Sequence, residues 1–536
     1  MFDKKHSAAE LASAAHSMSS TEKDLSKVAH VEVGDKVDDL AAAGHVATDA
    51  HGNPLFQFDA EAERRLVRKI DWCIVPTVSI LYLFCFIDRA NIGNARLAGF
   101  EKDLKLHGYQ FNILLTCFYI SYIVFEIPSN LCCKYFGPGK WIPFISLGFG
   151  VSGIVSPGQR SPSQVFSMIT AFVTNFSNAA AVRFLLGMFE AGMLPGIAYY
   201  MSRWYRKHEL GFRLGLYIVM APLAGAFGGL LASGILKLNG IGKVHTWQQI
   251  FLIEGIITIG LSIMSYFTLT DRPETARWLT EEEKALAIAR VKSENVGTSE
   301  VLDKLDTPKI LRGIFNPNTL MDSAIFFLDN ITVQGLGFFL PTIIATIYPK
   351  ATTIRKQLWT VPPYVVGACF VVVVPWLAMK TNRRLVYMIG SAPLVMIGYI
   401  IFLATKNTHA RYGATFLIAS GAFTFGPLCN AQASANTLSD TARSAAIGTT
   451  VMFGNIGGLV STWAFLPFDG PNYPIGNGLN LGTSSTMFLL CIVLLMWLTY
   501  DNKRRDRVDP DEKLQGMTEK QIQDLDWKHP GFRWHP

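Results

Sequence analysis

The sequence predicts an all-α membrane protein with twelve transmembrane helices arranged in two six-helix bundles. Three observations predict this class. The 536 residues are 50% hydrophobic and only 17% charged, whereas soluble domains carry roughly 25% charged residues. The mean hydropathy is +0.27, and the apolar residues form long blocks, several of which reach the roughly 20 residues that cross a bilayer core. Six such blocks precede a long polar stretch and six follow it.

The chain opens with a polar region, 1–60, that is rich in Ala, His, Ser and Asp and lacks a sustained apolar period. This composition predicts a disordered cytoplasmic tail. The region does not resemble a cleavable signal peptide, so the first transmembrane helix is expected to direct membrane insertion.

Residues 61–270 are predicted to form the N-terminal six-helix bundle. Its apolar spans lie near 71–90, 110–133, 141–177, 179–203, 213–237 and 248–270. The third span is interrupted at 157–164 by Pro-Gly-Gln-Arg-Ser-Pro-Ser-Gln, and these polar residues cannot lie in lipid without partners. The segment is either an outward loop or a short intron retained in frame. We favour the intron, because its removal leaves one continuous span of about bilayer length.

Residues 271–319 are predicted to form a cytoplasmic linker between the bundles. Within it, Thr280 and Glu283 match the capping box that begins many helices. The following apolar spacing predicts an amphipathic helix, which we interpret as a strut between the two halves.

The C-terminal bundle is predicted over 320–500, followed by a charged cytoplasmic tail, 501–536. Its spans lie near 320–347, 357–380, 385–405, 411–431, 443–467 and 484–500. Lys and Arg gather in alternate loops in a pattern that places both termini in the cytoplasm.

Four charged residues fall inside the first bundle, where each costs at least about 2.5–3.5 kcal/mol and therefore indicates function. Asp88 and Arg89 end the first span, and Arg183 and Glu190 lie in the fourth. Seven residues are nearly two helical turns, so Arg183 and Glu190 share a helix face about 10 Å apart. A guanidinium offers a fixed fork of donors to a carboxylate, and a nearby carboxyl group can exchange a proton. These are the parts needed to bind an organic anion and couple it to a proton.

A structural interpretation of the same residues is about as well supported by composition and spacing. Arg183 with Gly187 and Gly192 also fits close helix packing. Asp88 and Arg89 also fit a local ion pair at a helix end.

The surrounding strings resemble a known family. IDRANIGNARLAGFEKDL, FYISYIVFEIPSNL and VRFLLGMFEAGMLPG are similar to the fungal allantoate and vitamin permeases, a branch of the anion:cation symporter family within the major facilitator superfamily. The resemblance runs from about Arg65 to Tyr500. The chain departs from the wider superfamily after the second span, where 133–138 reads CKYFGP without the usual acidic residue.

The resemblance implies roles for the four charged residues. It assigns anion recognition to Arg89 and Arg183, and proton coupling to Asp88 and Glu190, with Glu190 favoured as the coupling site. The argument for Glu190 is that it lies further from its arginine than Asp88 does, and so titrates more readily. The resemblance also places the protein in the plasma membrane.

Weaker candidates complete the predicted site. In the second half, Asn330 and Gln334 are expected to contact substrate, and Asp329, Asn430, Gln432 and Asn455 are possible cavity residues. Glu254 is expected near the interface, paired with cytoplasmic basic residues. Structural or gating roles are predicted for Glu126, Pro128, Gly187, Gly192 and Pro195.

The sequence contains no phosphate-binding GxxxxGK[ST] string and no HExxH or GxSxG motif. We therefore expect neither an ATP-driven pump nor an enzyme, with no cofactor, no metal and no nucleic-acid partner. The expected function is proton-coupled uptake of a small organic anion, such as a nicotinate-, pantothenate- or allantoate-like compound, by a monomer in the lipid bilayer. An exporter on the same fold is the nearest alternative, and a nutrient sensor that does not transport is a weaker one.

Overall fold

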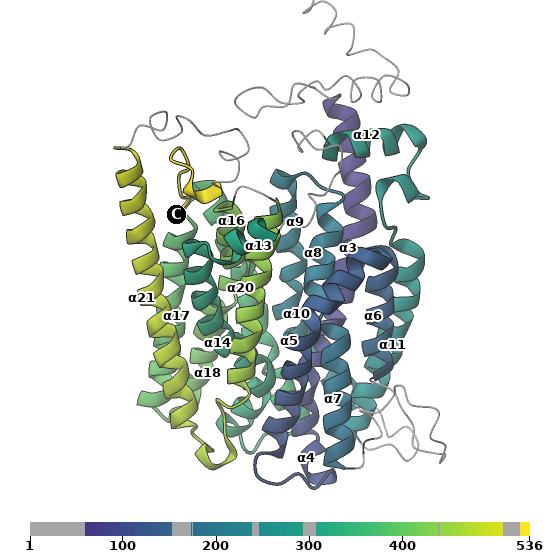
Figure 1. The fold of residues 1–536 in the computed structure, drawn as a ribbon. Coiled ribbons are helices and arrows are strands. Elements are labelled where there is room, and N and C mark those ends of the chain that lie inside the picture. The colour runs from purple at the N-terminus through teal and green to yellow at the C-terminus, as the bar shows by residue number, and fades with distance from the viewer. Residues whose placement is uncertain are drawn as a thin grey trace, which may run out of the picture.

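A computed structural model describes residues 59–152, 173, 175–237, 246–292, 307–437, 440–507 and 526–536. Every regular element within these ranges is a helix (Figure 1). The predicted disorder of the N-terminal tail up to residue 58 and the interruption at 157–164 lie outside the described residues.

The first half contains six helical segments that run across the molecule. They are α3 (Ala60–Leu97), α5 (Gln110–Phe136), α6 (Pro138–Ser152), α7 (Phe176–Glu190) with α8 (Met193–Ser202), α9 (Lys207–Ile218) with α10 (Met220–Ile235), and α11 (Thr246–Thr268). A short helix, α4 (Phe100–Asp103), lies between α3 and α5.

The second half repeats this pattern. It consists of α14 (Pro317–Ile347), α15 (Thr353–Leu358) with α16 (Val361–Thr381), α17 (Arg384–Ala404), α18 (Thr408–Ala422) with α19 (Phe425–Ala435), α20 (Asp440–Ser461) and α21 (Pro474–Arg505). Among the described residues, ten helices are long and apolar enough to cross a membrane. The described parts of α6 and α20 do not meet that criterion on their own, but they occupy the positions of the third and eleventh crossings. The predicted all-α membrane fold is therefore confirmed, and its helices are consistent with twelve crossings.

The two halves meet along three pairs of helices. α3 packs on α14, α5 on α20, and α10 on α16. In Figure 1 the purple-to-blue first half and the green-to-yellow second half stand side by side along these contacts. Residues on facing helices of the two halves can therefore form one shared site.

The fourth crossing is broken directly after Glu190. That residue ends α7, and α8 begins at Met193. Pro195 lies in the first turn of α8 and lacks the N–H that would continue the hydrogen-bond ladder from α7. The adjacent glycines permit close packing, since a Cβ on Gly187 would collide with the Phe118 carbonyl and one on Gly192 with the Ser129 side chain.

The linker contains two helices, α12 (Glu281–Lys292) and α13 (Thr307–Ile314). The predicted capping box is confirmed at the start of α12. The Thr280 backbone N–H donates to Glu283 Oε2 at 3.0 Å, and the Glu283 N–H donates to Thr280 Oγ1 at 3.3 Å. Partial burial opposes ionisation of Glu283, but hydrogen bonds from Lys69 and Thr280 outweigh it and lower its pKa. Glu283 therefore caps the start of α12 and also pairs with Lys69 of α3, which fixes α12 against the first half.

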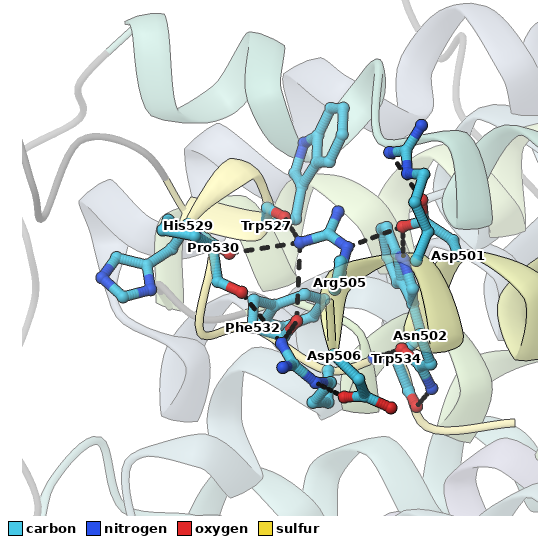
Figure 2. Close-up of polar contacts among 11 residues, drawn as sticks. Asp501, Asn502, Arg505, Asp506, Trp527, His529, Pro530, Phe532 and Trp534 are labelled. Carbon is cyan, nitrogen blue, oxygen red and sulfur yellow. Dashed lines mark hydrogen bonds and ion pairs between the residues drawn. The ribbon is translucent and has the colours of Figure 1, made fainter. Parts of the chain in front are cut away.

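The region after α21, predicted only as a charged cytoplasmic tail, contains an ordered segment. Residues 526–536 fold back onto the end of the second half (Figure 2). Trp534 is only 2% exposed, and its indole N–H donates to Asp501 Oδ2 at 2.7 Å. The Arg505 guanidinium donates to the carbonyls of Trp527 and His529 at 3.0 and 3.1 Å. This set of contacts orders the segment against α21.

The same segment also contacts the end of α19. The His535 N–H donates to Asn436 Oδ1 at 2.8 Å, and the side-chain amides of Gln432 and Asn436 donate to the His535 carbonyl at 2.9 and 3.0 Å. The interpretation of Gln432 as a cavity residue is therefore wrong. Its amide instead joins the C-terminal segment to α19.

Candidate functional site

A buried ion pair between α3 and α7 forms the centre of the candidate site. Arg89 Nε and Nη2 both donate to Glu190 Oε2, at 3.1 and 2.9 Å. Glu190 is fully buried and Arg89 nearly so. Because both groups lie away from water, removing either partner would leave an uncompensated charge, at a cost of roughly 3–5 kcal/mol.

Aromatic rings surround the guanidinium of Arg89. Its Cζ lies 4.6 Å from the ring centroid of Phe86, 5.2 Å from that of Phe118 and 5.0 Å from that of Tyr122. Ring faces attract a cation without accepting a strong hydrogen bond from it. The rings can therefore hold Arg89 in place while its N–H groups exchange one anion for another.

Arg183 is the second buried cation, and its donors are not satisfied. Its Nε and Nη2 have no hydrogen-bond partner within the described part of the chain. Its Cζ lies 5.7 Å from the ring centroid of Phe251 on α11. Buried charged donors are normally paired, so Arg183 offers an open position for an anion.

The structure corrects the pairing expected from sequence spacing. Arg183 and Glu190 share α7, but the Glu190 carboxylate bonds Arg89 across the helix interface. The premise that Glu190 lies further from an arginine than Asp88 does is therefore wrong. A local ion pair between Asp88 and Arg89 is also absent among the described contacts, because Asp88 accepts instead from Thr258 Oγ1 at 3.5 Å.

Glu254 also differs from its prediction. It is fully buried in α11, and it accepts a short hydrogen bond from the side-chain amide of Asn91 on α3. The expected pairing with cytoplasmic basic residues is wrong. Sequence analysis missed Asn91, although its position three residues after Asp88 in the same motif was a signal for it.

A small central cavity of about 30 Å³ lies between the halves. Arg89 and Gln334 line it from opposite halves, together with Phe338 and Tyr364. This volume is about that of one water molecule in the liquid. The conformation is therefore too closed at its centre for an organic anion, which requires side chains to move apart.

Two of the second-half candidates, Asn330 and Gln334, lie one helical turn apart on α14. Gln334 Nε2 donates to Asn330 Oδ1 at 3.4 Å, and Asn330 Nδ2 donates to the Phe326 carbonyl at 3.0 Å. Gln334 lines the cavity, whereas Asn330 lies behind it as a positioning neighbour. Asp329 is buried, and neither of its carboxylate oxygens has a hydrogen-bond partner among the described residues.

Hydrogen bonds across the interface close the site. Asn455 Nδ2 on α20 donates to Glu126 Oε2 on α5 at 3.1 Å. Towards the end where α5 begins, the side chains of Thr116 and Thr462 are 3.2 Å apart. Glu126 therefore joins the two halves, and exposed Pro128 follows it within α5. These contacts must break for that end of the molecule to open.

Comparison with known proteins places the chain in a family. The family model "Major Facilitator Superfamily" matches residues 78–462. An uncharacterized transporter of Schizosaccharomyces pombe is 32% identical over 485 residues, covering 90% of this chain and 92% of that protein. The MFS-type transporter cnsO of Penicillium expansum is 29% identical, with 89% and 91% covered.

Solved structures agree on the fold. The D-xylose-proton symporter aligns with a TM-score of 0.57 at 15% identity, covering 78% of this chain and 97% of that structure. A bacterial homolog of the human lysosomal transporter Spinster, in an inward-facing conformation, gives a TM-score of 0.57 at 14% identity, with 79% and 94% covered. Together with the all-helical membrane fold, these matches establish that this chain is a membrane transporter of the major facilitator superfamily.

Proposed function

We propose that this carrier couples the uptake of a small organic anion to the movement of a proton. The observation that carries the proposal is the buried pair of arginines. Arg89 is held by Glu190, whereas Arg183 Nε and Nη2 have no partner among the described residues. A carboxylate substrate is the ligand that matches two buried guanidinium groups, of which that of Arg89 lines the central cavity. Nicotinate-, pantothenate- and allantoate-like compounds fit this class.

The Arg89–Glu190 ion pair supplies a coupling step. When a proton binds Glu190, the carboxylate loses its charge, and its hold on Arg89 weakens. Arg89 can then donate to the incoming anion beside Arg183. Loss of the proton restores the ion pair and displaces the anion, so that proton and substrate move together.

Asp88 is the second acid of the proposed mechanism. It is held by one long hydrogen bond from Thr258, so its carboxylate is less constrained than that of Glu190. We assign it an orienting or secondary role. Gln334, which faces Arg89 across the cavity, is proposed to contact the substrate from the second half.

The proposed setting is the plasma membrane, with a monomeric carrier whose termini are both cytoplasmic. The concentration of Lys and Arg in alternate loops supports this orientation. Alternating closure of the two halves around the central cavity would then carry the anion across.

The proposal is tested with purified protein in vesicles, by measuring uptake of labelled carboxylates at two external pH values. We expect Glu190→Gln to abolish accumulation driven by a pH gradient, while exchange of substrate for substrate persists, because exchange needs the anion site but no net proton movement. Asp88→Asn is the matched variant, since it also replaces a buried acid by its amide, and it should retain part of the gradient-driven accumulation. If Glu190→Gln still accumulates substrate and Asp88→Asn does not, the two roles are reversed. If no carboxylate shows uptake that depends on pH, the proposal is wrong.

A further inference from the structure

A second and larger pocket lies away from the central site, at the α12 end of the first half. Its volume is about 580 Å³, within the range of roughly 300–1,000 Å³ that is usual for small-molecule sites. The end of α5, the start of α6, the end of α8, the segment after α11 and one face of α12 form its walls. Figure 1 shows α12 at the same end of the molecule as the C-terminus.

The pocket has an excess of positive charge. Four basic and two acidic side chains line it, which leaves two positive charges: Lys134, Lys140, Arg203 and Arg272 against Asp271 and Glu274. None of the four basic side chains forms an ion pair within the described ranges. Arg203 is oriented by the ring of Tyr199, whose centroid lies 5.6 Å from its Cζ. The cations therefore face a space that is free to receive an anion.

Neighbouring charges at this end of the molecule are paired. Lys69 Nζ lies 2.6 Å from Glu283 Oε2, and Arg290 Nε lies 2.7 Å from Glu63 Oε1. The chain thus has carboxylates available at this surface and uses them for other cations.

One of the two acids in the pocket is already engaged. Asp271 Oδ1 accepts a hydrogen bond from the Gly139 backbone N–H at 2.8 Å, at the start of α6. Gly139 leaves no room for a side chain, since a Cβ there would lie 2.9 Å from the Asp271 backbone nitrogen. Asp271 therefore serves to join α6 to the end of α11, and its charge is shared with the helix N-terminus.

The edge of the pocket is suited to a membrane surface. Tyr135, which lines the pocket at the end of α5, is 85% exposed, and Phe267, near the end of α11 but outside the pocket lining, is 73% exposed. Exposed aromatic side chains at helix ends are typical of the bilayer interface. A lipid bound in the pocket would therefore place its polar part among the cations and its acyl chains in the adjoining bilayer.

We propose that this pocket binds the phosphorylated head group of an anionic membrane phospholipid. Basic pockets between transmembrane helices on the cytoplasmic side are suited to such head groups. The proposal relies on the cytoplasmic orientation given above and does not depend on the transported substrate. Because Ile288 of α12 also lines the pocket, a bound lipid would join the linker helix to the first half.

The test is a binding measurement on the purified full-length protein in neutral detergent. The probes are dioctanoyl phosphatidylinositol 4-phosphate, dioctanoyl phosphatidylcholine and inorganic phosphate. We expect saturable binding of the first and none of the second. The double variant Arg203→Gln/Arg272→Gln should weaken that binding roughly thirty-fold, because each basic residue near an anionic head group contributes about fivefold in affinity.

Two controls make the result specific. Lys350→Gln/Lys406→Gln removes the same charge from exposed positions at the opposite helix ends and should leave binding unchanged. Glu274→Gln removes the exposed acid of the pocket and should tighten binding several-fold. Thermal unfolding without lipid checks that every variant is folded. Equal binding of phosphatidylcholine, equal loss in the control pair, or inorganic phosphate binding as tightly as the lipid would each overturn the proposal. None of these outcomes depends on whether the protein transports an anion.

Discussion

Arg183 differs from Arg89, the other buried arginine of the central site, in its lack of a carboxylate partner. Arg89 has a carboxylate partner, whereas Arg183 Nε and Nη2 are buried without a partner among the described residues. Burying a charged donor without a hydrogen-bond partner is unfavourable, and binding of an anion would supply the missing partner. We therefore expect anion binding to need the planar pair of donors of the Arg183 guanidinium as well as its positive charge.

We expect Arg183→Lys to lower kcat/KM for the anion roughly tenfold or more, because an ammonium group cannot reproduce bidentate hydrogen bonding. Uptake by the purified, reconstituted variant measures this. Arg96→Lys is the matched control, because Arg96 pairs with Glu101 outside the central cavity and should transport nearly normally. Unchanged kinetics in folded Arg183→Lys would remove Arg183 from the anion site.

Helices that look independent in the sequence are joined by single side chains. The helical character of the apolar blocks was predictable because segments of bilayer length have few alternatives in a membrane, although α3 and α21 extend well beyond the predicted spans. The partner of Glu190 was not, because Arg89 lies 101 positions away and helix periodicity relates only residues on one helix. Trp534 was missed for a similar reason. A short segment rich in aromatic residues has no periodicity, and its contacts are to α21 and α19 rather than to itself.

The docked C-terminal segment should stabilise the end of the second half. Trp534→Ala removes a buried indole and its hydrogen bond to Asp501, and large aromatic truncations in cores cost roughly 3–5 kcal/mol. We expect the thermal unfolding midpoint to fall by several degrees, as measured in detergent. Tyr500→Ala is the control, since Tyr500 is a largely exposed aromatic residue on α21, the helix against which Trp534 packs. Equal midpoints for the two variants would show that the docking contributes little to stability.

At the scale of the molecule, each half has its own internal contacts and the interface between them is the part that must change. Thr116 and Thr462 join α5 to α20 across the interface, with their hydroxyl oxygens 3.2 Å apart. Thr332 and Asn480 are also in hydrogen-bond contact, at 2.8 Å, but both belong to the second half. Cross-linking the first pair therefore tests motion between the two halves, whereas cross-linking the second pair tests motion within one half.

In a background without the native cysteines, we expect a disulfide between Thr116→Cys and Thr462→Cys to stop uptake, and reduction to restore it. The matched pair Thr332→Cys/Asn480→Cys should transport whether oxidised or reduced, because a rigid half can carry an internal link. Uptake before and after oxidation is the measurement. Transport through the oxidised interface pair would exclude movement of α5 relative to α20 as part of the cycle.

The four charged residues proposed to bind the anion and the proton also determine how the carrier responds to voltage. Arg89 and Arg183 together with Asp88 and Glu190 sum to zero formal charge when all four are ionised. Adding one proton and one monovalent anion leaves the sum at zero. On the proposed mechanism, the membrane potential, which acts at about 2.3 kcal/mol per elementary charge per 100 mV, then does no net work on either the empty or the loaded carrier. Accumulation of a monoanion would follow the pH difference alone, and a dianion carried with one proton would be opposed by the negative interior of the cell.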